Sequence, residues 1–149
     1  RVPFIDGQPR TIDGNIGQVD LVPTLLELLK QPLPEGLQGR SRAKVLEGSD
    51  SLGDNDVFVQ WNGAGDRDLG NEAINRLSAM PRRSVITGDR WKLNLCATDQ
   101  GELFDLGNDP HEITNLFDAP EHRDRIHDMV ARIRQWQVET GDDAPLPAL

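Results

Sequence analysis

The densest group of side chains that could do chemistry lies near the middle of the second half of the chain, where Asp105, Asp109, His111 and Glu112 occur close together. Carboxylate and imidazole groups of this kind can hold a metal ion. Asp109 precedes Pro110, however, and this dipeptide is typical of a turn whose acidic neighbours accept hydrogen bonds from nearby backbone N–H groups. We therefore expect a capped turn here and no metal site.

The single cysteine, Cys96, could in principle act as a nucleophile. It lies between Leu95 and Ala97 in a pattern typical of a strand, where cysteine is most often a small buried apolar side chain. A hydrolase also needs a base and donors for the developing negative charge. The sequence contains no Gly-x-Ser-x-Gly, no phosphate-binding glycine loop and no His-Glu-x-x-His. It therefore predicts no catalytic residue.

Arginine side chains near the expected strands are a further group with chemical potential. Arg82, Arg83 and Arg90 could present cations to an anionic substrate, because guanidinium groups form paired hydrogen bonds with carboxylate and phosphate oxygens. Ordinary surface charge is the alternative explanation for all three.

The overall composition limits the partners. The chain has 149 residues, with 25 Asp and Glu against 16 Lys and Arg, and a net charge of -9. Such a chain repels nucleic acid and anionic lipid, whose affinity for proteins comes mainly from Lys and Arg. The longest apolar run is interrupted at Glu27 and is far shorter than the ~20 residues of a membrane span. We expect neither nucleic acid nor membrane as a partner.

The expected elements differ between the two parts of the chain. The first part predicts a short buried strand at residues 2–5 and a helix at residues 20–29 that is apolar on nearly all sides, with Asp20 as its N-cap. Residues 48–56 are polar and typical of a linker. A chain that opens on Arg1 without a signal-peptide pattern is expected to be a piece of a longer protein.

The second part predicts a different architecture. Short strands are expected at residues 57–61, 84–87, 91–95 and 102–106. Turn residues separate the last three, so consecutive antiparallel hairpins are the simplest arrangement. An amphipathic helix is expected from Pro120 to Gly141, and residues 63–80 are expected to form a loop with at most a short helix. An antiparallel sheet of about four strands packed by a C-terminal helix is an α+β fold. The tail at residues 145–147 is expected to fray.

Several segments carry a family resemblance. They read V-D-L-V-P-T-L-L-E-L at residues 19–28, L-Q-G-R-S at 37–41, R-S-V-I-T and W-K-L at 83–93, and E-L-F-D-L with D-P at 102–110. In order and spacing they resemble the C-terminal portion of type I sulfatases, the arylsulfatase family of the alkaline phosphatase superfamily. Two residues depart from the family pattern: Ile86 stands where a second arginine is usual, and Arg42 stands where an apolar residue is common.

The resemblance implies which parts of a sulfatase are present. The family's formylglycine nucleophile arises from Cys or Ser in C/S-x-P-x-R, and Cys96 is followed by Ala97 and lacks that pattern. The family's calcium ligands and sulfate contacts precede the R-V-P that residues 1–3 resemble. The implied organisation is a remnant of the large α/β domain at residues 1–48, a linker at 49–56 and an antiparallel subdomain at 57–149.

The same resemblance implies a function for the parent protein. It is a sulfuric ester hydrolase that uses calcium and formylglycine, while this portion is inactive alone and helps wall the active site beside an N-terminal catalytic domain. Substrate contacts are expected at Asn62, Arg67 and Arg83. Relatives are often exported, so a periplasmic or extracellular location is implied.

Two alternatives remain open from the sequence. Phosphodiesterases and phosphonate hydrolases of the same superfamily share the architecture. A non-catalytic interaction module is the other alternative, because the apolar helix at residues 20–29 has no evident cover and would favour self-association of the isolated chain.

Overall fold

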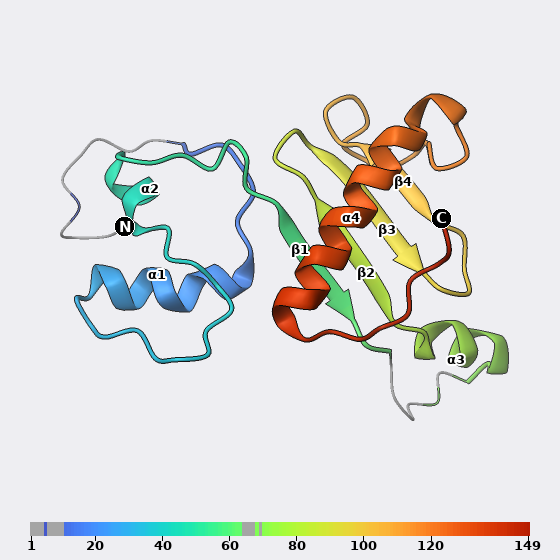
Figure 1. The fold of residues 1–149 in the computed structure, drawn as a ribbon, viewed down its shortest axis with the longest axis horizontal. Coiled ribbons are helices and arrows are strands. Elements are labelled where there is room, and N and C mark those ends of the chain that lie inside the picture. Colours follow the sequence, from blue (N-terminus) through green and yellow to red (C-terminus); the bar gives the residue numbers. More distant parts are fainter. Residues whose placement is uncertain (1–4, 6–10, 64–67, 69) are drawn as a thin grey trace. The chain divides into compact units, whose positions relative to one another are not determined.

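The computed structural model describes Ile5, residues 11–63, Asp68 and residues 70–149 (Figure 1). The chain forms two compact units, Arg1–Val57 and Phe58–Leu149, hereafter unit 1 and unit 2. The finer division expected from the sequence, with a linker at residues 49–56, stays a prediction.

The described part of unit 1 is helical and irregular. It contains a 3-10 turn at Gln18–Asp20, helix α1 at Leu21–Leu28 and helix α2 at Ala43–Glu47. The helix predicted at residues 20–29 is confirmed. The strand predicted at residues 2–5 lies outside the described residues except for Ile5, which is in a bend.

Asp20 does not cap α1 with its side chain, contrary to the sequence prediction. Its carboxylate instead accepts hydrogen bonds from the backbone N–H of Arg40 at 2.8 Å and from Nε of Arg42 at 2.9 Å. One turn later, Oγ1 of Thr24 accepts the backbone N–H of Arg42 at 2.8 Å. These partners are twenty or so positions away in the sequence, so a prediction from neighbouring residues misses them. Arg42, the departure from the family pattern, is therefore part of a polar network that fastens α1.

Part of the predicted linker also packs within unit 1. Leu52 is 6% exposed and forms a parallel bridge with Gly14. Asn55 accepts a hydrogen bond from Nη2 of Arg42 at 2.6 Å and donates from its side chain to the carbonyl of Asn15 at 2.8 Å. This portion of the stretch is thus held by long-range contacts that a polar composition does not reveal.

Helix α1 is covered on one side only within the described chain. Pro23, Thr24 and Leu28 are buried. Apolar side chains that remain about half exposed occupy the rest of the helix and its end: Leu21 51%, Val22 52%, Leu25 56% and Leu29 56%. A helix that is apolar all round needs cover on most of its surface. The cover for this side is not supplied by the described residues.

Unit 2, together with the adjoining Val57, is built on a four-stranded sheet. The strands are β1 at Val57–Trp61, β2 at Arg82–Ile86, β3 at Trp91–Cys96 and β4 at Glu102–Asp105, in the order β1-β2-β3-β4. Strands β2, β3 and β4 pair antiparallel, with Val85 opposite Leu93 and Leu93 opposite Leu103. The alternation of apolar and polar residues on β3 fixes this register, because a one-residue slip would turn the apolar side chains to the other face. The predicted hairpins are confirmed.

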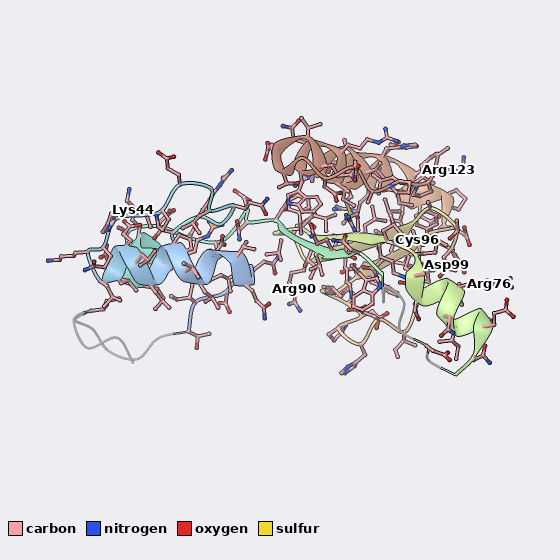
Figure 2. All side chains as sticks on the ribbon, turned by 90° about the horizontal axis from the view of Figure 1, so that it is seen from below. Lys44, Arg76, Arg90, Cys96, Asp99 and Arg123 are labelled. Carbon is pink, nitrogen blue, oxygen red and sulfur yellow. The ribbon has the colours of Figure 1, made fainter. Side chains whose placement is uncertain are left out.

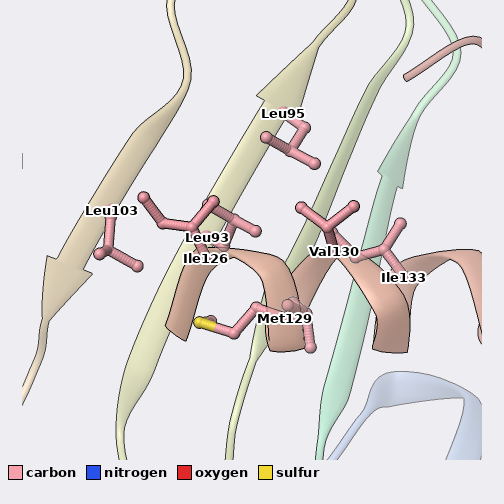
Figure 3. Packing of buried hydrophobic residues seen from close by; sticks show 8 residues of the cluster. Leu93, Leu95, Leu103, Ile126, Met129, Val130 and Ile133 are labelled. Atoms are coloured by element: carbon pink, nitrogen blue, oxygen red, sulfur yellow. The ribbon is translucent and has the colours of Figure 1, made fainter. Parts of the chain in front are cut away.

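A single long helix covers one face of the sheet (Figure 1). A 3-10 turn at Pro120–His122 leads into α4 at Arg123–Thr140. The core between helix and sheet is drawn in Figure 3, and its buried residues are Val85, Leu93, Leu95, Leu103, Ile126, Met129, Val130 and Ile133. At one side of it the ring of Trp136 stacks on Phe58, with centroids 5.4 Å apart. The predicted α+β fold is confirmed.

The C-terminal tail is more ordered than the sequence suggests. Leu146 packs against the core cluster, and Gln137 of α4 donates from Nε2 to the carbonyl of Ala144 at 2.8 Å. The prediction that the segment around Leu146 frays is therefore wrong, because an apolar residue between two prolines finds an apolar surface to cover.

A short helix, α3 at Glu72–Ala79, lies between β1 and β2. Asn71 caps it, accepting the backbone N–H groups of Ala73 at 2.9 Å and Ile74 at 3.2 Å. The expected loop with at most a short helix is confirmed for the part that the structure describes. Among the described residues, no helix combines the length and the apolar character needed to cross a bilayer.

Candidate functional site

Arg83 is the centre of the best-defined polar cluster in unit 2. Its side chain projects from β2 and only 3% of it is exposed. The guanidinium makes two hydrogen bonds to the carboxylate of Asp142, at 2.9 Å from Nε and 2.5 Å from Nη2. Nη1 donates to the carbonyls of Trp61 and Arg82 at 3.0 and 2.8 Å, and Nη2 also donates to Oδ1 of Asn62 at 2.8 Å. These contacts engage all five N–H donors of the group.

The fold brings Asp142 to this cluster through the end of α4. Gly141 ends the helix in the left-handed conformation, with φ 68°, which glycine adopts without the penalty of a Cβ. The next residue, Asp142, therefore turns toward the sheet, where Gln137 donates to its carboxylate at 2.7 Å. The Arg83 guanidinium, followed by Gln137, holds the pKa of Asp142 below its usual range.

Asn62 is the exposed member of the cluster. Its Oδ1 accepts the hydrogen bond from Arg83, while the residue is exposed to solvent. Among the residues that the structure describes, its Nδ2 has no hydrogen-bond partner. A guanidinium can only donate, so this contact fixes Oδ1 of Asn62 as the side of the amide that faces Arg83. The side turned away from Arg83 carries two N–H donors.

The residues at the end of β1 lie close to the end of α3. Nε1 of Trp61 donates to the carbonyl of Ser78 at 3.2 Å. Gly63 has φ 93°, and a Cβ there would overlap the backbone carbonyl of Ala79. Only glycine at position 63 allows the backbone to approach Ala79 so closely. Asn62 thus lies between two residues, Trp61 and Gly63, that are held against the end of α3.

The structure brings two of the three predicted substrate contacts together. Asn62 and Arg83 are hydrogen-bonded, whereas Arg67 lies outside the described residues. Contact of any of them with a substrate stays a prediction. Asp142 was missed, since it lies 59 positions from Arg83 and only its place after a helix-ending glycine marked it.

The guanidinium groups of two other candidate arginines are not part of this cluster. Arg82 forms an ion pair with Asp99 at 2.7 Å, and Arg90 donates from Nη2 to the carbonyl of Leu106 at 2.9 Å. Figure 2 shows Arg90 and Asp99 well apart in unit 2. Both arginines have protein partners at the turns of the sheet, as ordinary surface charges do.

The matching family model is that of N-sulphoglucosamine sulphohydrolase, C-terminal, and it covers residues 5–139. The chain belongs to this sulfatase family.

Similar proteins agree with the family. Sulfatase YidJ of Escherichia coli (strain K12) is 30% identical over 136 residues, which are 86% of this chain and 25% of that protein. A solved 2-O GAG sulfatase gives a TM-score of 0.68 at 25% identity, over 87% of this chain and 27% of its own. A phosphonate monoester hydrolase of Agrobacterium radiobacter shares the fold, with a TM-score of 0.64 at 20% identity over 81% of this chain and 24% of its own. The sulfatase chain thus spans about a quarter of the length of these relatives.

The residues described in this sulfatase chain do not fit the family's cofactors. Cys96 is 2% exposed on β3, its thiol lies 3.9 Å from Oγ1 of Thr98, and its following residue is Ala97, so it does not fit the formylglycine pattern. Within the described ranges no group of three or more His, Cys, Asp or Glu side chains gathers as a metal site would require. The family implies calcium and formylglycine for the full enzyme.

The acidic cluster after β4 of the sulfatase chain forms a capped turn, as predicted. Oδ2 of Asp105 accepts from Nδ2 of Asn108 at 2.7 Å, and Oδ2 of Asp109 accepts the backbone N–H of Thr114 at 2.8 Å. These hydrogen bonds lower the pKa of both carboxyl groups. Glu112 forms an ion pair with the lysine of β3 at 2.7 Å. The side chains of this cluster therefore stabilise the loop that contains them.

The Asp142 carboxyl predicts a specific pH dependence of stability. Because its pKa is lowered in the folded state, its contribution is complete above the unfolded-state value of about 4 and is lost as the pH falls through the folded value. The difference in unfolding free energy between wild type and Asp142→Asn should be largest near neutral pH and should narrow in acid. Urea unfolding across a pH series measures it, and a constant difference would contradict the assignment.

Proposed function

We propose that this chain is the C-terminal domain of a sulfatase, a sulfuric ester hydrolase. One observation carries the proposal: the family model covers residues 5–139, while sulfatase relatives extend over about four times this length. Since Cys96 does not fit the nucleophile pattern and no metal cluster occurs among the described residues, we infer that the chain is inactive alone. An N-terminal catalytic domain is then its partner and supplies the nucleophile and the calcium ligands.

Unit 2 contributes a wall of the active site in this proposal. Asn62, at the end of β1, is exposed and offers N–H donors, and Arg67 would add a positive charge in the segment that follows. Arg83 acts behind Asn62, because its guanidinium is buried and its donors are engaged. Residues 1–48 would complete the large α/β domain of the parent, and residues 49–56 would lead into unit 2.

Turnover of a chromogenic aryl sulfate with calcium tests the proposal. The full-length parent is expected to hydrolyse the ester, and the 149-residue chain is expected to be inactive. Activity of the chain alone would refute the placement of the catalytic groups in another domain. A parent that cleaves an aryl phosphonate but no sulfate would favour the phosphonate hydrolase alternative, whose fold the chain shares at a TM-score of 0.64.

The exposed side of α1 predicts self-association of the isolated chain. Leu21, Leu25 and Leu29 are each about half exposed. Association of two such apolar surfaces removes them from water and lowers the free energy. In the parent, the N-terminal domain would provide this cover. Light scattering of the isolated chain should show oligomers that dissociate on dilution.

Leu25→Lys supplies the matched variant for this prediction, because it places a charge on the exposed side without touching the buried Leu28. It should be monomeric at concentrations where the wild-type chain is not. A wild-type chain that stays monomeric at high concentration would remove the interaction surface from consideration.

A further inference from the structure

The hydrogen bonds at Arg83 run from the partly buried carboxylate of Asp142 to the exposed amide of Asn62. Asp142 is 13% exposed and binds the guanidinium through both oxygens. Arg83, whose side chain is 3% exposed, donates a hydrogen bond from Nη2 to Oδ1 of Asn62. Asn62 in turn is exposed, and its Nδ2 has no hydrogen-bond partner among the described residues. Each member is oriented by the one behind it.

This order of contacts makes the Asn62 amide a preset donor. Flipping the amide would point its NH2 group at the guanidinium and would forfeit a charge-assisted hydrogen bond. Rotating Arg83 instead would break its two bonds to Asp142 and those to the carbonyls of Trp61 and Arg82. The N–H groups of Nδ2 are therefore held away from Arg83 before any ligand arrives, and little conformational entropy is lost when a ligand binds.

We propose that Asn62 binds substrate by donating from Nδ2 to an acceptor oxygen of the sulfate ester, and that Arg83 and Asp142 are positioning residues for this donor. The proposal rests on the sulfatase function proposed above and deepens it. Arg83 does not touch the substrate in this arrangement, because no donor of its guanidinium remains free. Arg83 therefore affects substrate binding only by orienting the Asn62 amide.

Steady-state kinetics of the full-length parent on an aryl sulfate test the donor. Asn62→Ala should raise KM by about threefold to tenfold with kcat within about twofold, which is the range for one lost hydrogen bond. Asn62→Asp should raise KM further. The carboxylate keeps the hydrogen bond to Arg83, but its second oxygen replaces the N–H donors and repels the acceptor oxygen of the sulfate ester. An unchanged KM in both variants would overturn the donor role.

A double-mutant cycle tests the positioning role. Asp142→Asn should raise KM in the wild-type background and have no further effect on KM in the Asn62→Ala background. A merely structural role predicts the same change in both backgrounds, and that result would overturn the positioning role. Asp89→Asn is the matched control: it breaks the ion pair of Asp89 with Arg125 of α4, 2.8 Å long, and should leave KM unchanged.

A readout without turnover separates this proposal from the sulfatase function itself. In the 149-residue chain, the side-chain NH2 resonances of Asn62 are the pair that disappears in Asn62→Asp. They should shift in Asp142→Asn and stay in place in Asp89→Asn. If the parent hydrolyses no sulfate ester, the proposed sulfatase function is refuted, while this shift still supports the positioning contact. Resonances that do not move in Asp142→Asn would overturn the positioning contact.

Discussion

Replacing Leu93 by alanine is expected to lower the free energy of unfolding of unit 2 by about 3 kcal/mol, within the range of such core truncations. Leu93 is fully buried in the centre of β3, between Val85 on β2 and Leu103 on β4, and beneath α4. Truncation removes apolar contacts and leaves a cavity that paired strands cannot close. The loss should therefore combine a transfer cost with a cavity cost.

Fluorescence during urea unfolding measures this change directly. All three tryptophans of the chain, Trp61, Trp91 and Trp136, belong to unit 2, so the signal reports that unit. Val138→Ala on α4 is the matched control, because Val138 is 79% exposed and its truncation should change the free energy by less than about 0.5 kcal/mol. A loss below about 1 kcal/mol for Leu93→Ala would contradict the packing described for this core.

Replacing Arg83 by alanine is expected to cost about 3 to 5 kcal/mol, although the residue is charged and belongs to no apolar core. The change leaves the Asp142 carboxylate, 13% exposed, without its cation. It also removes donors from the carbonyls of Trp61 and Arg82 and from Oδ1 of Asn62. The largest part of the loss comes from the Asp142 carboxylate, because its desolvation would no longer be offset by a cation.

Arg76 provides the matched control for this prediction. It pairs with Glu72 on the surface of α3, where the two side chains are 74% and 81% exposed, so Arg76→Ala should change stability by less than about 0.5 kcal/mol. The double variant Arg83→Ala with Asp142→Ala should be at least as stable as Arg83→Ala alone, because it removes the abandoned charge. Equal, small effects at Arg83 and Arg76 would contradict the structural role of the cluster.

The function proposed for this chain depends on its family and on a domain that it does not include. In the proposed function, unit 2 would contribute to turnover through the shape and the hydrogen-bond donors of a pocket wall. Asn62, which Arg83 and Asp142 hold in place, would be the part of the proposed wall whose hydrogen bonds are most fully described.

The sequence by itself determined the elements whose signals are local. Alternating apolar residues on β3, the apolar spacing along α4 and the helix-ending Gly141 predicted these elements close to their observed bounds. The turn at Asp109 was also predictable, because Asp109 caps the N–H of Thr114, five positions away. In each case the interacting groups lie within a turn or two of the chain, where residue type and spacing are sufficient evidence.

Only the tertiary structure decided the partners of the buried charges. Asp20 looked like an N-cap, yet its carboxylate binds Arg42, 22 positions away. Asn62 and Arg83 were both singled out, but their contact, and the Asp142 carboxylate that completes it 59 positions from Arg83, follow from how α4 ends against the sheet. A charged side chain that leaves water must find a partner wherever packing places one, and that choice is made by the fold as a whole rather than by neighbouring residues.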